Sequence, residues 1–171
     1  IFPSRFVADS SVLIAVEHGN LIEALFQLPC EILTTDFIVN ELNRKRPLGT
    51  RMIEKGLIVR DLSPQQVARI QVLISRHKGT SVPDISCYIL AEELSIPLLT
   101  GDGGLRAAAL HAGIRTHGTL FVLDQLVKHR TLRPPDASDS LKRIQECGAR
   151  LPKSECAKRY RRWKAGRQEG V

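Results

Sequence analysis

Short apolar runs alternate along the chain with longer stretches in which apolar residues recur every three or four positions. The short runs predict strands at 5–8, 30–34, 57–62, 96–100 and 114–118. The longer stretches predict helices at 10–18, 21–27, 36–45, 64–78, 83–95, 103–112 and 119–129. Strands that alternate with helices favour an α/β fold, with a central, mainly parallel sheet covered by helices on both faces in three layers.

The dipeptide Pro134-Pro135 interrupts this alternation. Beyond it the pattern predicts two helices, at 138–147 and 154–165, and no strand. We therefore expect an α/β domain over residues 1–133 and a helical extension over 134–171. A chain of 171 residues is long enough to bury roughly 70% of its unfolded surface.

The net charge of +7 is concentrated at the C-terminal end. Ten basic residues and two acids fall between Lys142 and Arg167, a local balance of +8 that leaves −1 for the rest of the chain. The predicted extension is therefore basic, and the predicted α/β domain is nearly neutral.

Several protein classes do not fit the sequence. The four cysteines form no CxxC pair and the five histidines form no HExxH motif, which disfavours disulfides and a zinc hydrolase. No apolar run approaches the roughly 20 residues needed to cross a bilayer, and no secretory signal is visible. We expect a cytoplasmic protein with reduced thiols and no membrane partner.

Four acids lie where a predicted strand or loop meets a helix or just inside one: Asp9, Glu41, Asp84 and Asp102. Taken singly, an aspartate at a helix start is most simply a cap that accepts backbone N–H bonds. Asp36 and Asp136 are interpreted in that way. The question is whether the four acids share a further role.

Their placement favours one. Ligands of open parallel sheets bind at the carboxyl ends of the strands, and Asp9 and Asp102 each follow a predicted strand. Asp84 opens the helix that leads into the strand at 96–100, and Glu41 lies about two turns into the helix after the second strand. Two carboxylates about 5 Å apart repel by roughly 3 kcal/mol at an effective dielectric near 20. A cluster of acids without His or Cys suits Mg²⁺ or Mn²⁺.

Other sites built on acids or phosphate loops fit less well. A dinucleotide fold needs GxGxxG after its first strand, which "ADSSVL" lacks, and "GDGGL" at 101–105 comes too late and has the wrong spacing. A phosphatase of the haloacid dehalogenase type has a second acid two residues after its nucleophile, where this chain has Ser11. No P-loop is present.

The order of these acids, within "DSSVLI", "PDISCYILA" and "LLTGDGGLR", closely resembles the PIN (PilT N-terminus) domain, most of all the VapC-like ribonuclease toxins of toxin–antitoxin systems. The resemblance covers residues 5 to about 130, and the C-terminal helices are similar to those of a subgroup with an extra helical end. It implies the PIN-like α/β/α fold and a Mg²⁺- or Mn²⁺-dependent endoribonuclease.

The resemblance also implies a role for each residue. Asp9, Asp84 and Asp102 would be the metal ligands, and Glu41 would be a further ligand or would orient the attacking water. Ser11 and Thr100 would support the carboxylates or phosphate from behind. Ser11 stands where Asn is common in the family, and Gly103-Gly104 where larger residues are frequent.

The basic end allows three interpretations. Cys156, Tyr160 and Trp163 form one apolar helix face, which is typical of a surface helix that packs on the body with solvated charges. We favour a further role, in which Arg159, Arg161 and Arg162 bind RNA phosphates and Tyr160 or Trp163 stacks on bases. The third interpretation is a docking surface for an acidic stretch of an antitoxin.

Together these observations predict a metal-dependent endoribonuclease that cuts RNA phosphodiesters, the toxin of a toxin–antitoxin pair. The alternatives are an RNA-processing PIN nuclease without an antitoxin and a PIN-shaped module that binds RNA or protein without cleaving. The expected partners are RNA and a cognate antitoxin, and a homodimer is left open.

Overall fold

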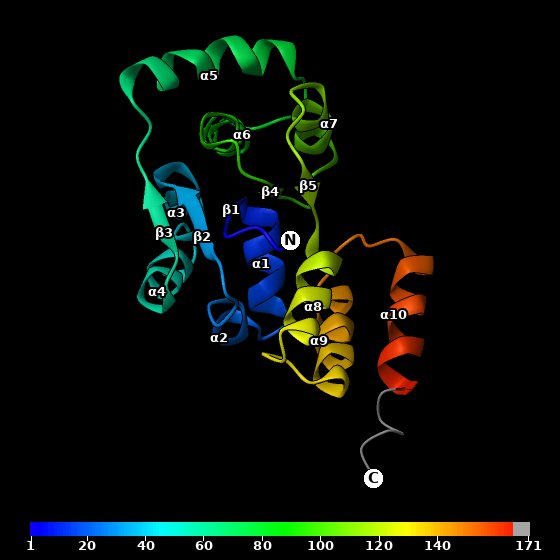
Figure 1. Cartoon of the computed structure of the whole chain (residues 1–171). Helices are drawn as coiled ribbons and strands as arrows, with labels where there is room; N and C mark the ends of the chain where they lie inside the picture. Colours follow the sequence, from blue (N-terminus) through cyan, green and yellow to red (C-terminus); the bar gives the residue numbers. More distant parts are fainter. Residues whose placement is uncertain (166–171) are drawn as a thin grey trace. The chain divides into compact units, whose positions relative to one another are not determined.

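A computed structural model describes residues 1–165 of the chain (Figure 1). By their contacts the residues fall into two compact units. Unit 1 comprises Ile1–Ile14 and Pro29–Gly118, and unit 2 comprises Ala15–Leu28 and the chain from Thr119 onward. The sequence-based boundary at Pro134 lies further along the chain than this second division. Arg167, the last cation of the predicted basic segment, lies outside the described residues.

Unit 1 contains a five-stranded sheet in the order β3-β2-β1-β4-β5, and every neighbouring pair is parallel. The strands are β1 (Arg5–Ala8), β2 (Glu31–Thr35), β3 (Ile58–Arg60), β4 (Leu98–Leu99) and β5 (Thr116–His117). All five lie within or one residue beyond the predicted runs. Because the central strands are covered, Phe6, Val7 and Leu98 are almost completely buried. The predicted parallel α/β architecture is confirmed.

Helices flank this sheet (Figure 1). They are α3 (Asp36–Leu42), α4 (Leu48–Lys55), α5 (Pro64–Arg76), α6 (Val82–Leu94) and α7 (Gly103–His111), together with the start of α1 (Ser10–His18). The sequence analysis predicted no helix over the residues of α4, because the proline at position 47 suggested only the end of the helix predicted at 36–45. Pro47 is in fact the N-cap of α4, whose residues Leu48 and Met52 are buried.

The central helix of unit 1 is α6, which contacts β1, β2 and β4 as well as α3, α5 and α7. Surrounded in this way, it buries every residue from Ile85 to Ala91, as expected of a helix that is covered on all sides. Its start is fixed by a capping box between Ser81 and Asp84. The first turn of α6 therefore has a defined position relative to the ends of the central strands.

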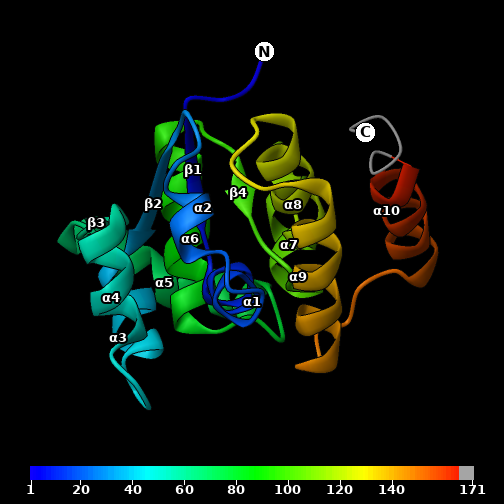
Figure 2. The same cartoon turned by 90° about the horizontal axis from the view of Figure 1, so that it is seen from below.

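Unit 2 is helical and contains α2 (Ile22–Leu25), α8 (Thr119–Lys128), α9 (Pro134–Glu146), α10 (Lys153–Ala165) and the end of α1. α9 contacts both α8 and α10, and these three helices are best seen in Figure 2. The prediction that Pro134-Pro135 breaks the chain before a helix at 138 was wrong in its boundary. The two prolines occupy the first turn of α9, where a missing N–H costs no helical hydrogen bond. Among the described residues, no helix has the length and apolarity needed to span a membrane.

Candidate functional site

The sheet order places a topological switch point between β1 and β4. From β1 the chain builds outward through β2 and β3, whereas β4 begins the opposite half with β5. Crevices outside the carboxyl ends of two such strands are the usual ligand sites of open α/β sheets. Asp9 directly follows β1, and Thr100 directly follows β4.

The carboxylate of Asp9 is fully buried and accepts three hydrogen bonds at this point. Ser11 Oγ and the backbone N–H of Val12 donate to Oδ1 at 2.7 and 3.1 Å. Thr100 Oγ1 donates to Oδ2 at 2.5 Å. All three donors are neutral, so none of these hydrogen bonds brings a positive charge to Asp9.

The same two hydroxyls join the loops that follow β1 and β4. Ser11 Oγ accepts the backbone N–H of Gly101 at 2.8 Å, and Thr100 Oγ1 accepts the backbone N–H of Asp102 at 3.0 Å. Each hydroxyl therefore donates to Asp9 and accepts from the β4–α7 loop. This arrangement fixes Asp102 in register with Asp9.

Burial raises the pKa of the Asp9 carboxyl to about 6. The hydrogen bonds from Thr100, Ser11 and Val12 lower it, whereas the nearby charge of Asp84 raises it. Asp9 and Asp84 also both raise the pKa of the Cys87 thiol, after the larger effect of its burial. Asp9 and Asp84 therefore lie close enough to interact electrostatically.

Asp84 is at the same time a helix-capping residue. Its Oδ2 accepts the backbone N–H of Ser81 at 2.8 Å, and its own N–H donates to Ser81 Oγ at 3.2 Å. The bland interpretation of Asp84 as a first-turn acid is thus correct for its hydrogen bonds. Its electrostatic coupling to Asp9 shows that capping and proximity to the strand ends occur together.

Two further hydroxyls position the first turn of α6, and the sequence analysis missed their part in the site. Ser86 Oγ lies 2.6 Å from both Thr35 Oγ1 and the carbonyl oxygen of Pro83. A hydroxyl has one proton to donate. Because the Ser86 proton goes to the Pro83 carbonyl, Thr35 is the donor between the two hydroxyls. The signal for Ser86 was present, as a polar residue within the apolar run "ISCYIL".

Asp102 is the N-cap of α7 and accepts the backbone N–H of Leu105 at 2.7 Å. A Cβ at Gly104 would lie 3.3 Å from Asp102 Oδ1 and in ordinary contact with Thr80 Cγ2, at 3.6 Å. The loop before α6 therefore lies beside the first turn of α7, and these two helix starts carry Asp84 and Asp102.

Two acids of α3 have carboxylate oxygens that are buried without a hydrogen bond among the described residues, Asp36 Oδ1 and Glu41 Oε2. The cap of α3 is Thr35, whose hydroxyl accepts the N–H of Ile38. Asp36 therefore occupies the first helical position rather than the cap position assumed from sequence. An unsatisfied buried acceptor costs about 1–3 kcal/mol, so Glu41 retains the capacity to bind a proton donor or a cation.

The donor set at this edge consists of carboxylates and hydroxyls, and its one nearby thiol, that of Cys87, is buried. Such a set suits a hard divalent cation. As placed, no three His, Cys, Asp or Glu side chains within residues 1–165 are arranged to hold a metal ion. Asp84 and Asp102 each use one carboxylate oxygen to cap the start of their own helix. The other oxygen of each accepts no hydrogen bond within residues 1–165, so the chemistry of this donor set fits a hard divalent cation.

Comparison with known proteins identifies the family of the chain. Residues 5–165 match the family described as DUF3368, PIN domain. The chain belongs to the PIN domain family. The match reaches through α10, so both units of this PIN-domain protein are part of the family's extent.

Among solved structures, the chain is similar to a PilT N-terminus domain protein from the hyperthermophilic archaeon Sulfolobus solfataricus P2. The two share 15% sequence identity with a TM-score of 0.50, over 73% of this chain and 95% of the other. A likeness at this identity supports the PIN fold and nothing finer. No curated protein matches the chain significantly.

In unit 2, the basic helix α10 uses several of its charges internally. Arg159 is 14% exposed, and its guanidinium donates to both oxygens of Asp124 on α8 and to Glu155. Arg162 also binds Asp124. Of the three arginines predicted to bind RNA, Arg161 is the one without an ion pair among the described residues.

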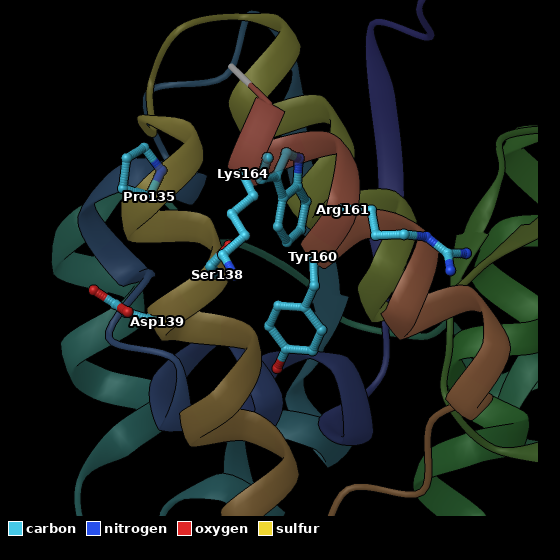
Figure 3. A pocket seen from close by; sticks show the side chains of 7 residues that line it. Pro135, Ser138, Asp139, Tyr160, Arg161 and Lys164 are labelled. Carbon is cyan, nitrogen blue, oxygen red and sulfur yellow. The ribbon is translucent and has the colours of Figure 1, made fainter. Parts of the chain in front are cut away.

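The apolar face of α10 packs into unit 2. Cys156 and Trp163 are buried, and the Tyr160 hydroxyl donates to Gln145 Oε1 on α9 at 2.7 Å. A cavity of about 420 Å³ lies between α9 and α10 (Figure 3). Tyr160, Arg161 and Lys164 are among the residues that line it, and the end of the Arg161 side chain points away from Pro135 and Asp139. Trp163 is only 2% exposed, which argues against its stacking on a base.

Proposed function

We propose that this PIN-domain protein is a Mg²⁺- or Mn²⁺-dependent endoribonuclease whose site is the switch point between β1 and β4. The observation that carries the proposal is the buried Asp9 carboxylate, which is held by neutral donors only and lies close enough to Asp84 for their charges to interact. Such a carboxylate is stabilised by a cation from solution. In the proposed site Asp9, Asp84 and Asp102 hold the ion.

The side chains of the site have separate tasks in this proposal. Ser11 and Thr100 keep the Asp9 carboxylate in one orientation and hold the β4–α7 loop beside it. Glu41, with its buried and unpaired Oε2, orients the attacking water or adds a further ligand. Mg²⁺ or Mn²⁺, when bound, supplies positive charge that offsets the negative charge developing on the attacked phosphate and makes water more acidic.

The direct test is incubation of the purified protein with structured RNAs in Mg²⁺ or Mn²⁺, with a chelator as the control. We expect internal cleavage that requires the metal. Asp84→Asn, purified in the same way, controls for a contaminating ribonuclease. An inactive wild type contradicts the proposal, and so does cleavage that persists in chelator or in Asp84→Asn.

From the resemblance to VapC-like toxins we also propose a cognate antitoxin as a partner. Exposed cations of unit 2, including Lys142, Lys153 and Lys164, offer complementary charge to an acidic segment of such a partner. Inhibition of RNA cleavage by the product of a small neighbouring gene is the expected result. A wild-type enzyme that no such product binds or inhibits supports an RNA-processing nuclease without an antitoxin instead.

A further inference from the structure

Arg106 on α7 is exposed and binds the backbone beside the candidate site. Its Nη2 donates a hydrogen bond of 3.0 Å to the backbone carbonyl oxygen of Thr100. The side chain is thus turned back toward the loop that follows β4. The Thr100 residue that receives this bond also holds the Asp9 carboxylate through its hydroxyl.

Gly118, just after β5, leaves room for this guanidinium. A Cβ at Gly118 would lie 3.2 Å from Arg106 Nη2 and 3.6 Å from the Thr100 carbonyl oxygen. Gly118 is not among the glycines with positive φ, which are Gly56, Gly79, Gly113 and Gly148. A side chain at position 118 would therefore crowd the end of Arg106, which places the guanidinium beside Gly118.

Arg106 also differs from other arginines of the chain in its electrostatic surroundings. Arg69, Arg133 and Arg159 each bind a carboxylate. Within residues 1–165, Arg106 is paired with no carboxylate, and its hydrogen bond to a neutral carbonyl uses one of five guanidinium N–H groups. A guanidinium with four remaining donors therefore lies at the carboxyl ends of β4 and β5, bound to the residue that also holds Asp9.

We propose that Arg106 binds a backbone phosphate of the RNA substrate next to the carboxylates, an inference that rests on the proposed function. The planar guanidinium presents paired N–H groups that match phosphate oxygens. Its bond to Thr100 links the position of the bound phosphate to the residue that orients Asp9. Arg106 thus supplies the positive charge that the chain itself brings to an otherwise acidic site.

The test compares steady-state cleavage by wild type, Arg106→Gln, Arg106→Lys and Gly118→Ala. We expect Arg106→Gln to lower kcat/KM by about 10–100-fold, the value of a charged hydrogen bond, with a larger KM. Arg106→Lys should recover part of the loss, since it keeps the charge without the planar fork. Gly118→Ala should cost less than Arg106→Gln, because the end of the flexible Arg106 side chain needs to shift by only a few tenths of an ångström.

The matched control is Arg115→Gln, which replaces an exposed arginine at the amino end of β5, away from the carboxyl ends of the strands. It should cleave like wild type. RNA binding in Ca²⁺ gives a second readout, in which Arg106→Gln should flatten the log–log salt slope by roughly 0.7 for one single-stranded phosphate contact. Metal binding and melting temperature should stay unchanged in Arg106→Gln, which separates phosphate binding from a structural role.

Two results would overturn the assignment in different ways. Wild type that cleaves RNA while Arg106→Gln matches Arg115→Gln in KM, kcat and salt slope removes Arg106 but leaves the proposed function standing. Wild type that neither cleaves nor binds RNA removes the proposed function, and the role of Arg106 with it.

Discussion

Asp9 and Asp124 are the same chemical group in opposite surroundings. Asp124 on α8 is bound by Arg159 and Arg162, so its charge is neutralised within the chain. Asp9 is more deeply buried, yet its hydrogen bonds come from two hydroxyls and one backbone N–H. The comparison teaches that Asp124 serves to hold α10 against α8, whereas Asp9 keeps a negative charge for which a partner must come from outside.

The largest expected effect is on RNA cleavage. Asp9→Asn, Asp84→Asn and Asp102→Asn should each lose more than the roughly 10–100-fold that removal of an outer partner of a metal site costs, because each keeps its shape and loses its charge. Initial rates of RNA cleavage in Mn²⁺ measure the loss.

Asp61→Asn is the matched control, an exposed aspartate of the same unit, and it should retain full activity. We prefer it to Asp36→Asn, because Asp36 has a buried unpaired oxygen. Equal rates in the control and the three site variants would remove the proposed distinction between these acids.

A second prediction concerns the stability of the metal-free protein. The Asp9 pKa is raised from 3.8 to about 6 in the folded state, so between these values the unfolded chain ionises first. The free energy of unfolding therefore carries no penalty from Asp9 below about pH 4. It falls as the pH rises to about 6, by about 3 kcal/mol in all, since each pKa unit corresponds to about 1.36 kcal/mol.

Chemical unfolding in chelator at pH 4 to 7 measures this change. The difference in unfolding free energy between wild type and Asp9→Asn cancels the titration of other groups, and it should shift in favour of Asp9→Asn with rising pH. A difference that does not change with pH would show that the buried carboxylate carries no such electrostatic cost.

The third prediction concerns Asp124, whose loss should lower stability and leave RNA cleavage unchanged. Asp124→Asn removes the carboxylate that Arg159 and Arg162 share, and it leaves the largely buried Arg159 with Glu155 as its remaining carboxylate partner. We expect a loss of about 1–3 kcal/mol in the free energy of unfolding, less than for a fully buried pair because Asp124 is 23% exposed. RNA cleavage below the unfolding transition should be unchanged, and a loss of cleavage without a loss of stability would contradict the structural role of Asp124.

The smallest effect is expected at the basic end. Arg161 has no ion pair among the described residues, and replacing it with Gln should flatten the salt dependence of RNA binding by roughly 0.7 in log–log slope if it contacts one single-stranded phosphate. Arg115→Gln is the control. An unchanged slope would leave α10 as a packed surface helix with solvated charges.

The sequence predicted the sheet and most helices because their signals are local. Apolar runs marked all five strands, and Ser63-Pro64 marked a helix start that the structure confirms. The misses came from proline, which begins α9 and caps α4 but was taken as an end.

The candidate site was predictable in part for a similar reason. The predicted strand ends and helix starts show where Asp9 and Asp102 lie in their elements. The strand order then brings both residues to the carboxyl ends of β1 and β4. The pairing of Arg159 with Asp124, 35 residues apart, depends on how helices pack and has no local signal. The hydroxyl chain through Thr35 and Ser86 likewise joins residues that are distant in the sequence.

The most direct test of the central claim is calorimetric titration of the metal-free protein with Mn²⁺. If Asp9 lacks a partner within the chain, wild type should bind Mn²⁺ at millimolar concentration or below, with a higher melting temperature. Asp9→Asn should lose this binding, and Asp124→Asn should retain it. Wild type that binds no Mn²⁺, or that binds it no better than Asp9→Asn, would contradict the claim that the switch-point carboxylates await a cation.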